Sequence, residues 1–161
     1  MSDIYLNTTP TIAGIKSIFW FIPVRDVASQ AGATVTLTAG KQWRTAKGTK
    51  FKGSITTRQL GHKAFSISLT TKLAHLSPAL DAVLKQYTGA EGFLVIYDDL
   101  NGYRWLIGSK SQPLRLRHNY GSGSTPGESV GVSLSFSGNV TGQQAKIEYT
   151  DAIDAGTVVP V

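Results

Sequence analysis

The chain has 161 residues and a mass of 17.2 kDa, enough for one domain with a buried core. Its longest apolar run, residues 18–24, is far shorter than the roughly 20 residues of a membrane-spanning helix, and the N-terminus lacks the pattern of a secretory signal. The absence of cysteine excludes disulfides and thiolate metal sites. The net charge of +6 is unevenly placed, because Val27 to Leu80 contains no acidic residue. This asymmetry favours either a surface for an anionic partner or a solvated set of strands and loops.

The first part of the chain predicts two strands between irregular segments. Residues 1–14 are polar and rich in threonine, which indicates an extended N-terminal arm. Residues 16–24 are aromatic and β-branched, as in a buried strand, and residues 34–38 alternate as in a second strand. Residues 39–62 place scattered aromatic side chains among glycines and cations. We expect this segment to be a long hairpin or loop that projects from the body.

The middle of the chain predicts one strand and the single helix. Residues 63–73 alternate small polar with apolar side chains, which indicates a two-faced strand. A helix at about residues 77–88 follows from Ser77 as N-cap, Pro78 in the first turn and Gly89 after the last turn.

Residues 90–150 predict one antiparallel β meander. The turn at Asp98 to Gly102 contains Asn-Gly, which supplies the positive-φ positions of a tight hairpin. Apolar residues alternate with basic ones in residues 113–118 and with small ones in residues 130–138, as expected for strands. The tail, residues 151–161, has no periodicity, and we expect an arm that a partner orders. The whole chain is thus predicted to be one mainly β domain, a small antiparallel β sandwich or barrel with one helix.

The candidate site residues are cations and the aromatic residues among them. In residues 39–62, aromatic side chains alternate with cations, a pairing used to stack bases and to contact phosphates, or to hold the loop on a neighbouring subunit. Two further cations occupy alternate positions of one strand and therefore share a face. The predicted inter-subunit or nucleic-acid contacts are Lys41, Trp43, Arg44, Lys47, Lys50, Phe51, Lys52, Arg58, Arg115 and Arg117.

No pattern of an enzyme, metal or cofactor site emerges. His62, His75 and His118 lie far apart in the sequence, without partners at metal-ligand spacing. The carboxylates of Asp98 and Asp99 suit the adjacent turn better than acid–base chemistry. The glycine- and serine-rich loop at residues 121–127 lacks the lysine and the helix of a phosphate-binding loop, and no serine lies in a G-x-S-x-G motif. The sequence predicts no catalytic residue, metal or cofactor.

The second half of the chain resembles the tail tube and neck structural proteins of tailed bacteriophages, a fold also used by contractile injection systems. The resemblance covers about residues 63–150. It is based on the hairpin F-L-V-I-Y-D-D-L-N-G-Y-R-W-L-I-G-S, on Gln112 to Leu114, on the Gly/Ser loop, and on V-S-L-S-F-S-G, which ends in an F-x-G signature.

This resemblance implies a non-enzymatic virion protein that assembles into rings, often hexameric, which stack into a tube through which DNA passes. It implies as partners further copies of the chain, other tail or neck proteins and, transiently, the genomic DNA, but no membrane. Assembly would take place in the host cytoplasm, and the product would lie in the virion tail. The alternative from the residues alone is a nucleic-acid-binding small β-barrel module of the OB type, in which Trp43 stacks on single-stranded bases.

Overall fold

The computed structural model describes residues 14–48, 53–73, 78–87, 91–121, 131–141 and 146–158. It confirms the predicted fold class, a mainly β and mainly antiparallel chain with one helix. The elements are β1 (Ile15–Pro23), a 3-10 turn (Val24–Asp26), β2 (Val27–Ala31), β3 (Thr34–Leu37), β4 (Trp43–Lys47), β5 (Ser54–Gln59), β6 (Ala64–Leu73), α1 (Pro78–Tyr87), β7 (Gly92–Asp99), β8 (Arg104–Ile107), β9 (Leu114–Gly121), β10 (Gly131–Thr141), β11 (Lys146–Glu148) and β12 (Ala155–Val158).

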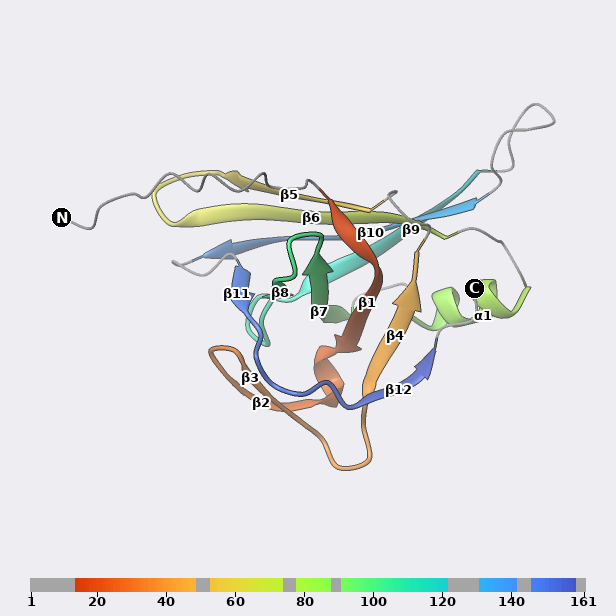
Figure 1. Cartoon of the computed structure of the whole chain (residues 1–161), viewed down its shortest axis with the longest axis horizontal. Helices are drawn as coiled ribbons and strands as arrows, with labels where there is room; N and C mark the ends of the chain where they lie inside the picture. The colour runs from red at the N-terminus through yellow and green to blue at the C-terminus, as the bar shows by residue number, and fades with distance from the viewer. Residues whose placement is uncertain are drawn as a thin grey trace.

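Ten strands form one branched sheet in the order β12-β4-β1-β7-β9-β10-β6-β5, with β8 on β7 and β11 on β8. β2 and β3 form a separate hairpin, at the bottom of Figure 1. Every pairing is antiparallel except that of β12 with β4. The strands β5, β6, β10 and β9 lie side by side across the top of the same view.

The predicted meander of residues 90–150 is wrong in its strand order. β7 and β8 form the expected hairpin, and so do β9 and β10, but β9 pairs with β7 and not with β8. β8 and β9 both run antiparallel to β7, opposite successive parts of it, and the chain leaves β8 at Gly108, whose φ of +80° lies in the left-handed region. A Cβ atom there would lie 3.0 Å from the Phe93 carbonyl oxygen, so glycine allows the chain to cross close to β7.

Residues 39–62 were predicted to project as one loop, and this is wrong for the described part. Residues 43–47 are β4, which pairs with β1, and residues 54–59 are β5, which pairs with β6. The reason is that apolar side chains of this segment complete the core: Trp43 and Ala46 are buried, and Ile55 packs against the core. Residues 49–52 lie outside the described residues.

β7 is the central strand, and it is buried on both faces. Its side chains alternate between two hydrophobic clusters, Phe93, Val95 and Tyr97 in the first and Leu94 and Ile96 in the second. A strand covered on both faces reads as a continuous apolar run, which explains its sequence.

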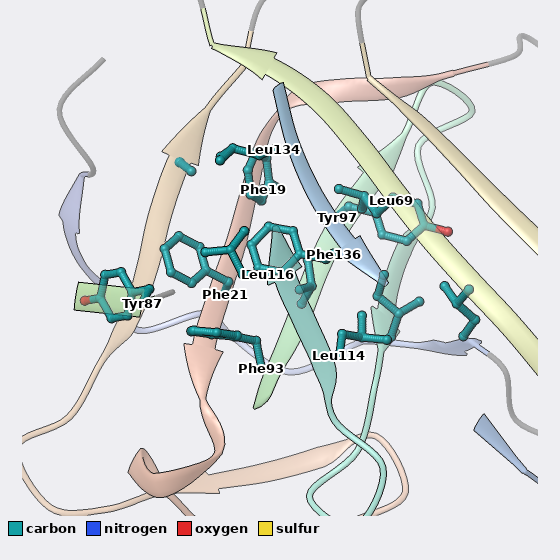
Figure 2. Close-up of a cluster of buried hydrophobic side chains, with 14 of the residues drawn as sticks. Phe19, Phe21, Leu69, Tyr87, Phe93, Tyr97, Leu114, Leu116, Leu134 and Phe136 are labelled. Carbon is teal, nitrogen blue, oxygen red and sulfur yellow. The ribbon is translucent and has the colours of Figure 1, made fainter. Parts of the chain in front are cut away.

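The first cluster is aromatic at its centre (Figure 2). The rings of Phe21, Phe93 and Phe136 lie 5.6–6.0 Å apart, mostly edge to face, an arrangement that stabilises beyond the area buried. The second cluster lies on the opposite face, where the β2–β3 hairpin and the segment around Tyr149 cover the sheet.

The sheet curls until the end of β4 meets β6. A Cβ atom on Gly48 would overlap the Thr71 hydroxyl oxygen and would lie 3.2 Å from the Lys72 carbonyl oxygen. A residue without a Cβ atom therefore fits where β4 and β6, each next to an end strand of the sheet, approach each other. The curl places β1, β6 and β10 around one core.

The predicted helix is confirmed as α1, although its predicted caps, Ser77 and Gly89, lie outside the described residues. It packs through Leu84 and Tyr87, whose ring lies 5.6 Å from that of Phe21. Of the helices that the described ranges contain, none is long and apolar enough to cross a membrane.

The two predicted arms have different outcomes. Residues 1–13 lie outside the described residues, as do residues 159–161. For residues 151–158 the prediction of a partner-ordered arm is wrong, because β12 pairs with β4 of the same chain. Asp154 joins them further: its carbonyl accepts the Trp43 N–H at 3.0 Å, and its carboxylate accepts the Gln42 side-chain amide at 2.9 Å.

Candidate functional site

The outward-facing side chains of β5, β6, β10 and β9 form a broad surface, the polar face. Most inward positions of β6, β9 and β10 are apolar, β5 contributes Ile55 to the core, and the outward positions of all four strands are small, polar or cationic. Its members are Ser54, Thr56, Arg58, Ser66, Ser68, Thr70, Lys72, Ser133, Ser135, Ser137, Asn139, Arg115, Arg117 and Asn119. Because alternate residues of a strand share a face, one hydrophobic core holds all of them outward.

The strand registers arrange this face in rows. One row crosses four strands as Thr56, Ser68, Ser137 and Arg115, and the next as Ser54, Thr70, Ser135 and Arg117. Each row is thus a line of hydroxyl groups that ends in an arginine on β9. Arg58, opposite Ser66, adds a guanidinium group at the other edge.

The polar face carries four positive charges and no negative one. Arg58, Arg115 and Arg117 are exposed, and in the described part of the chain no ion pair involves them or Lys72. By contrast, five cations elsewhere lie within 4 Å of a carboxylate: Lys16, Arg25, Lys41, Lys85 and Arg104. The free guanidinium groups are therefore available to an anion from outside the chain.

A shallow hollow of about 330 Å³ lies at the β9 side of this face. Its lining residues are Ser66, Pro113, Arg115, Arg117, Ser137, Gly138 and Asn139. Hydrogen-bond donors line this hollow, and among the described residues no carboxylate does.

Three of the ten predicted site residues lie on this face. Arg115 and Arg117 share it as predicted, and Arg58 joins them from the segment 39–62. The cations of the β4 region lie elsewhere: Lys41 is 3.7 Å from the Asp26 carboxylate, and Arg44 and Lys47 are on β4. Lys50, Phe51 and Lys52 lie outside the described residues.

The role predicted for Trp43 is wrong. Its side chain is 2% exposed and lies in the second cluster, where its ring packs edge to face on Tyr149 at 6.3 Å. It therefore cannot stack on a base. The aromatic residue among cations signalled a ligand contact, but burial against the C-terminal segment decides its role.

Sequence reasoning missed the hydroxyl rows and Lys72. The signal was present, since serine and threonine alternate with apolar residues in both β6 and β10. What the sequence does not show is that these two strands are neighbours over ten residue pairs, from Val132 opposite Leu73 to Thr141 opposite Ala64.

Asp98 and Asp99 have structural roles, as predicted from the turn. Asp99 accepts the backbone N–H groups of Asn101 and Tyr103 and the indole N–H of Trp105, at 2.9–3.0 Å. Asp98 binds Arg104 through both carboxylate oxygens, at 2.7 and 3.2 Å, which raises the pKa of that guanidinium group. Arg104 also lies over the Trp20 ring, 4.9 Å from its centre.

A second polar cluster joins α1 to β9. The Tyr120 hydroxyl donates to the Asp81 carboxylate at 2.6 Å, and Asp81 also pairs with Lys85 at 2.7 Å. The Lys85 ammonium and this hydrogen bond lower the pKa of Asp81, and the same bond raises the pKa of Tyr120 to about 12. The His118 and Tyr120 rings pack edge to face, with their centroids 4.9 Å apart. Across the described ranges, no group of three or more histidines and carboxylates is placed to hold a metal ion.

Comparison of the chain with protein-family models, with curated proteins and with solved structures found no match. The resemblance to tail tube and neck proteins therefore stays a prediction from the sequence.

Proposed function

We propose that this protein is a virion structural subunit that assembles into rings of a phage tail tube or of the adjoining neck, through which DNA passes. The observation that carries the proposal is the edge strand β5. It ends the main sheet, and no described strand pairs with its outer side. The resemblance of residues 63–150 supplies the identity of the assembly.

β5 has the properties of a strand that accepts a partner. Its sequence, S-I-T-T-R-Q, is rich in β-branched residues, contains no proline and has a single charge, Arg58. Monomeric proteins protect such an edge with charges, proline, bulges or a covering segment. Pairing with a strand from a second copy would satisfy its free backbone groups and extend the sheet across a subunit boundary.

The proposal includes rings of several copies, hexamers by the resemblance, which stack and bind other tail or neck proteins. Assembly in the host cytoplasm and a final place in the virion tail belong to the same proposal. The alternative of a free module that stacks single-stranded bases on Trp43 has no support from the described residues, because that side chain is buried.

The test is the mass of the purified protein by light scattering, followed by negative-stain microscopy of the same sample. We expect rings, stacks or tubes. A protein that remains a monomer at high concentration, alone and with tail or neck proteins from the same virion, would contradict the proposal.

A variant of the edge strand makes the test specific. The Leu60 N–H bonds to the Ala64 carbonyl at 2.8 Å, and antiparallel pairs alternate, so the Thr57 N–H points away from β6. Thr57→Pro removes that outward donor and leaves the β5–β6 ladder intact, as proline does on natural edge strands. We expect Thr57→Pro to abolish rings and the control Thr57→Val to form them. Rings of Thr57→Pro that match those of the native protein would exclude β5 as the interface.

A further inference from the structure

We infer that the polar face binds the sugar–phosphate backbone of double-stranded DNA without reading its sequence. The inference assigns a ligand to one surface of the chain, and it rests on the proposed function only for the source of that DNA.

The charge argument concerns the guanidinium groups. Arg58, Arg115 and Arg117 are exposed and have no described carboxylate partner. A free guanidinium group binds phosphate through two parallel hydrogen bonds, and the hydroxyls of serine and threonine are common donors to phosphate oxygens. All the charges and most of the polar groups of this face thus match one ligand chemistry.

The shape of the face fits a long and regular polyanion. Arg115 and Arg117 are about 7 Å apart along β9, and the rows extend about 14 Å across three strand spacings. In the two rows that end in Arg115 and Arg117, the other side chains are serine and threonine, so a phosphate backbone can approach the sheet there. The hollow at Ser137 and Gly138 adds a depression beside Arg115 and Arg117.

The absence of aromatic residues selects a duplex over a single strand. None of the members of the polar face is aromatic, and single-strand binding depends on bases that stack on aromatic rings. The described part of the face also has no protruding element, which a protein needs in order to reach base edges in a groove and to read the sequence. The contacts that this face can make are therefore those with phosphate groups, which do not depend on the DNA sequence.

The experiment compares two double variants of equal charge change. Arg115→Gln with Arg117→Gln removes two cations of the polar face. Lys85→Gln with Lys110→Gln removes two exposed cations from α1 and from the β8–β9 connection. Binding of a short fluorescent duplex of mixed sequence, and of one of its strands alone, is measured by anisotropy over a series of salt concentrations. Thermal unfolding confirms that each variant is folded.

We expect the native protein to bind the duplex more tightly than the single strand, with an affinity that falls steeply with salt. The arginine variant should bind about tenfold more weakly at low salt, and its plot of log affinity against log salt should be shallower by about 2, one unit for each lost phosphate contact. The lysine variant should bind as the native protein does.

Absence of duplex binding by the native protein, or an equal loss in both variants, would overturn the inference. A stronger affinity for the single strand would overturn the choice of ligand. The oligomeric state of each sample is measured in the same buffer. Rings without duplex binding would contradict this inference alone, and duplex binding by a monomer that never assembles would contradict the proposed function alone.

Discussion

Two regions of this sheet use charge in opposite ways. Around the β7–β8 hairpin, the cations Lys16 and Arg104 both lie against Asp98, and Arg104 also covers Trp20. On the polar face, three arginines lie among hydroxyl groups and have no carboxylate partner among the described residues. The charged side chains around the hairpin bind partners within the fold, so they hold its elements together. The arginines of the polar face keep their hydrogen-bonding groups for a partner outside it. This is the physical difference between a structural and a binding surface.

The difference has its origin in the acidic residues. Both carboxylates of the hairpin turn occur within two consecutive residues, Asp98 and Asp99, and each has described partners. Two strands of the polar face, β5 and β6, belong to the stretch from Val27 to Leu80, which has no acidic residue. The other two strands, β9 and β10, have no acidic residue either.

The largest effect separates the two sides of β10. Phe136 contacts the rings of Phe19, Phe21 and Phe93, whereas the neighbouring Ser137 faces outward. Phe136→Ala should lower the free energy of unfolding by about 3–5 kcal/mol. Ser137→Ala should change it by no more than about 0.5 kcal/mol. Chemical denaturation measures both, and similar losses would mean that the polar face is part of the core.

The next effect compares a paired with a free charge. Asp98→Asn should cost about 1.5–3 kcal/mol, because Arg104 loses its charged bidentate partner in a half-buried setting. Arg117→Gln, on the polar face, should change stability by about 0.5 kcal/mol or less. A cost of Arg117→Gln as large as that of Asp98→Asn would show that the polar face has a structural partner.

A similar or smaller effect on stability is expected where the curled sheet brings the end of β4 against β6. Gly48→Ala should destabilise the protein by about 1–3 kcal/mol, since the added methyl group meets the buried Thr71. In a Thr71→Ala background the same substitution should cost less, because the blocking hydroxyl is gone. Gly61→Ala is the control, since nothing lies within 4 Å of its Cβ position. Equal costs in both backgrounds would show that the contact is absent in solution.

The smallest effect is the pH dependence of the Tyr120–Asp81 bond. The pKa of Asp81 is lowered from 3.8, so its contribution is present above that pH and is lost as pH falls through the folded-state value. The pKa of Tyr120 is raised from 10.0 to about 12, so its contribution is present below pH 10 and is lost as pH rises toward 12. The Tm difference between the native protein and Tyr120→Phe should therefore be greatest between these limits. A difference that does not vary with pH would exclude the bond.

The sequence by itself determined the local structure and the two sides of each strand. Alternation predicted the strands at residues 63–73 and 130–138 with their buried residues Ile67, Leu69, Leu134 and Phe136. Turn and capping residues predicted the hairpin at Asp98 to Gly102 and the helix. These signals are local, because side-chain direction along a strand and backbone conformation in a turn depend on near neighbours in the chain.

Only the tertiary structure decided which strands are neighbours. It placed β9 against β7, drew Trp43 into the core beside Tyr149, and joined the C-terminal β12 to β4. Part of the candidate site was predictable, since Arg115 and Arg117 occupy alternate positions of one strand. That Arg58 lies on the same face of the sheet was not predictable. Alternation assigns a side chain to one face of its strand, but it does not determine which strand lies beside it. Burial in a shared core, between residues that are distant in the sequence, makes that choice.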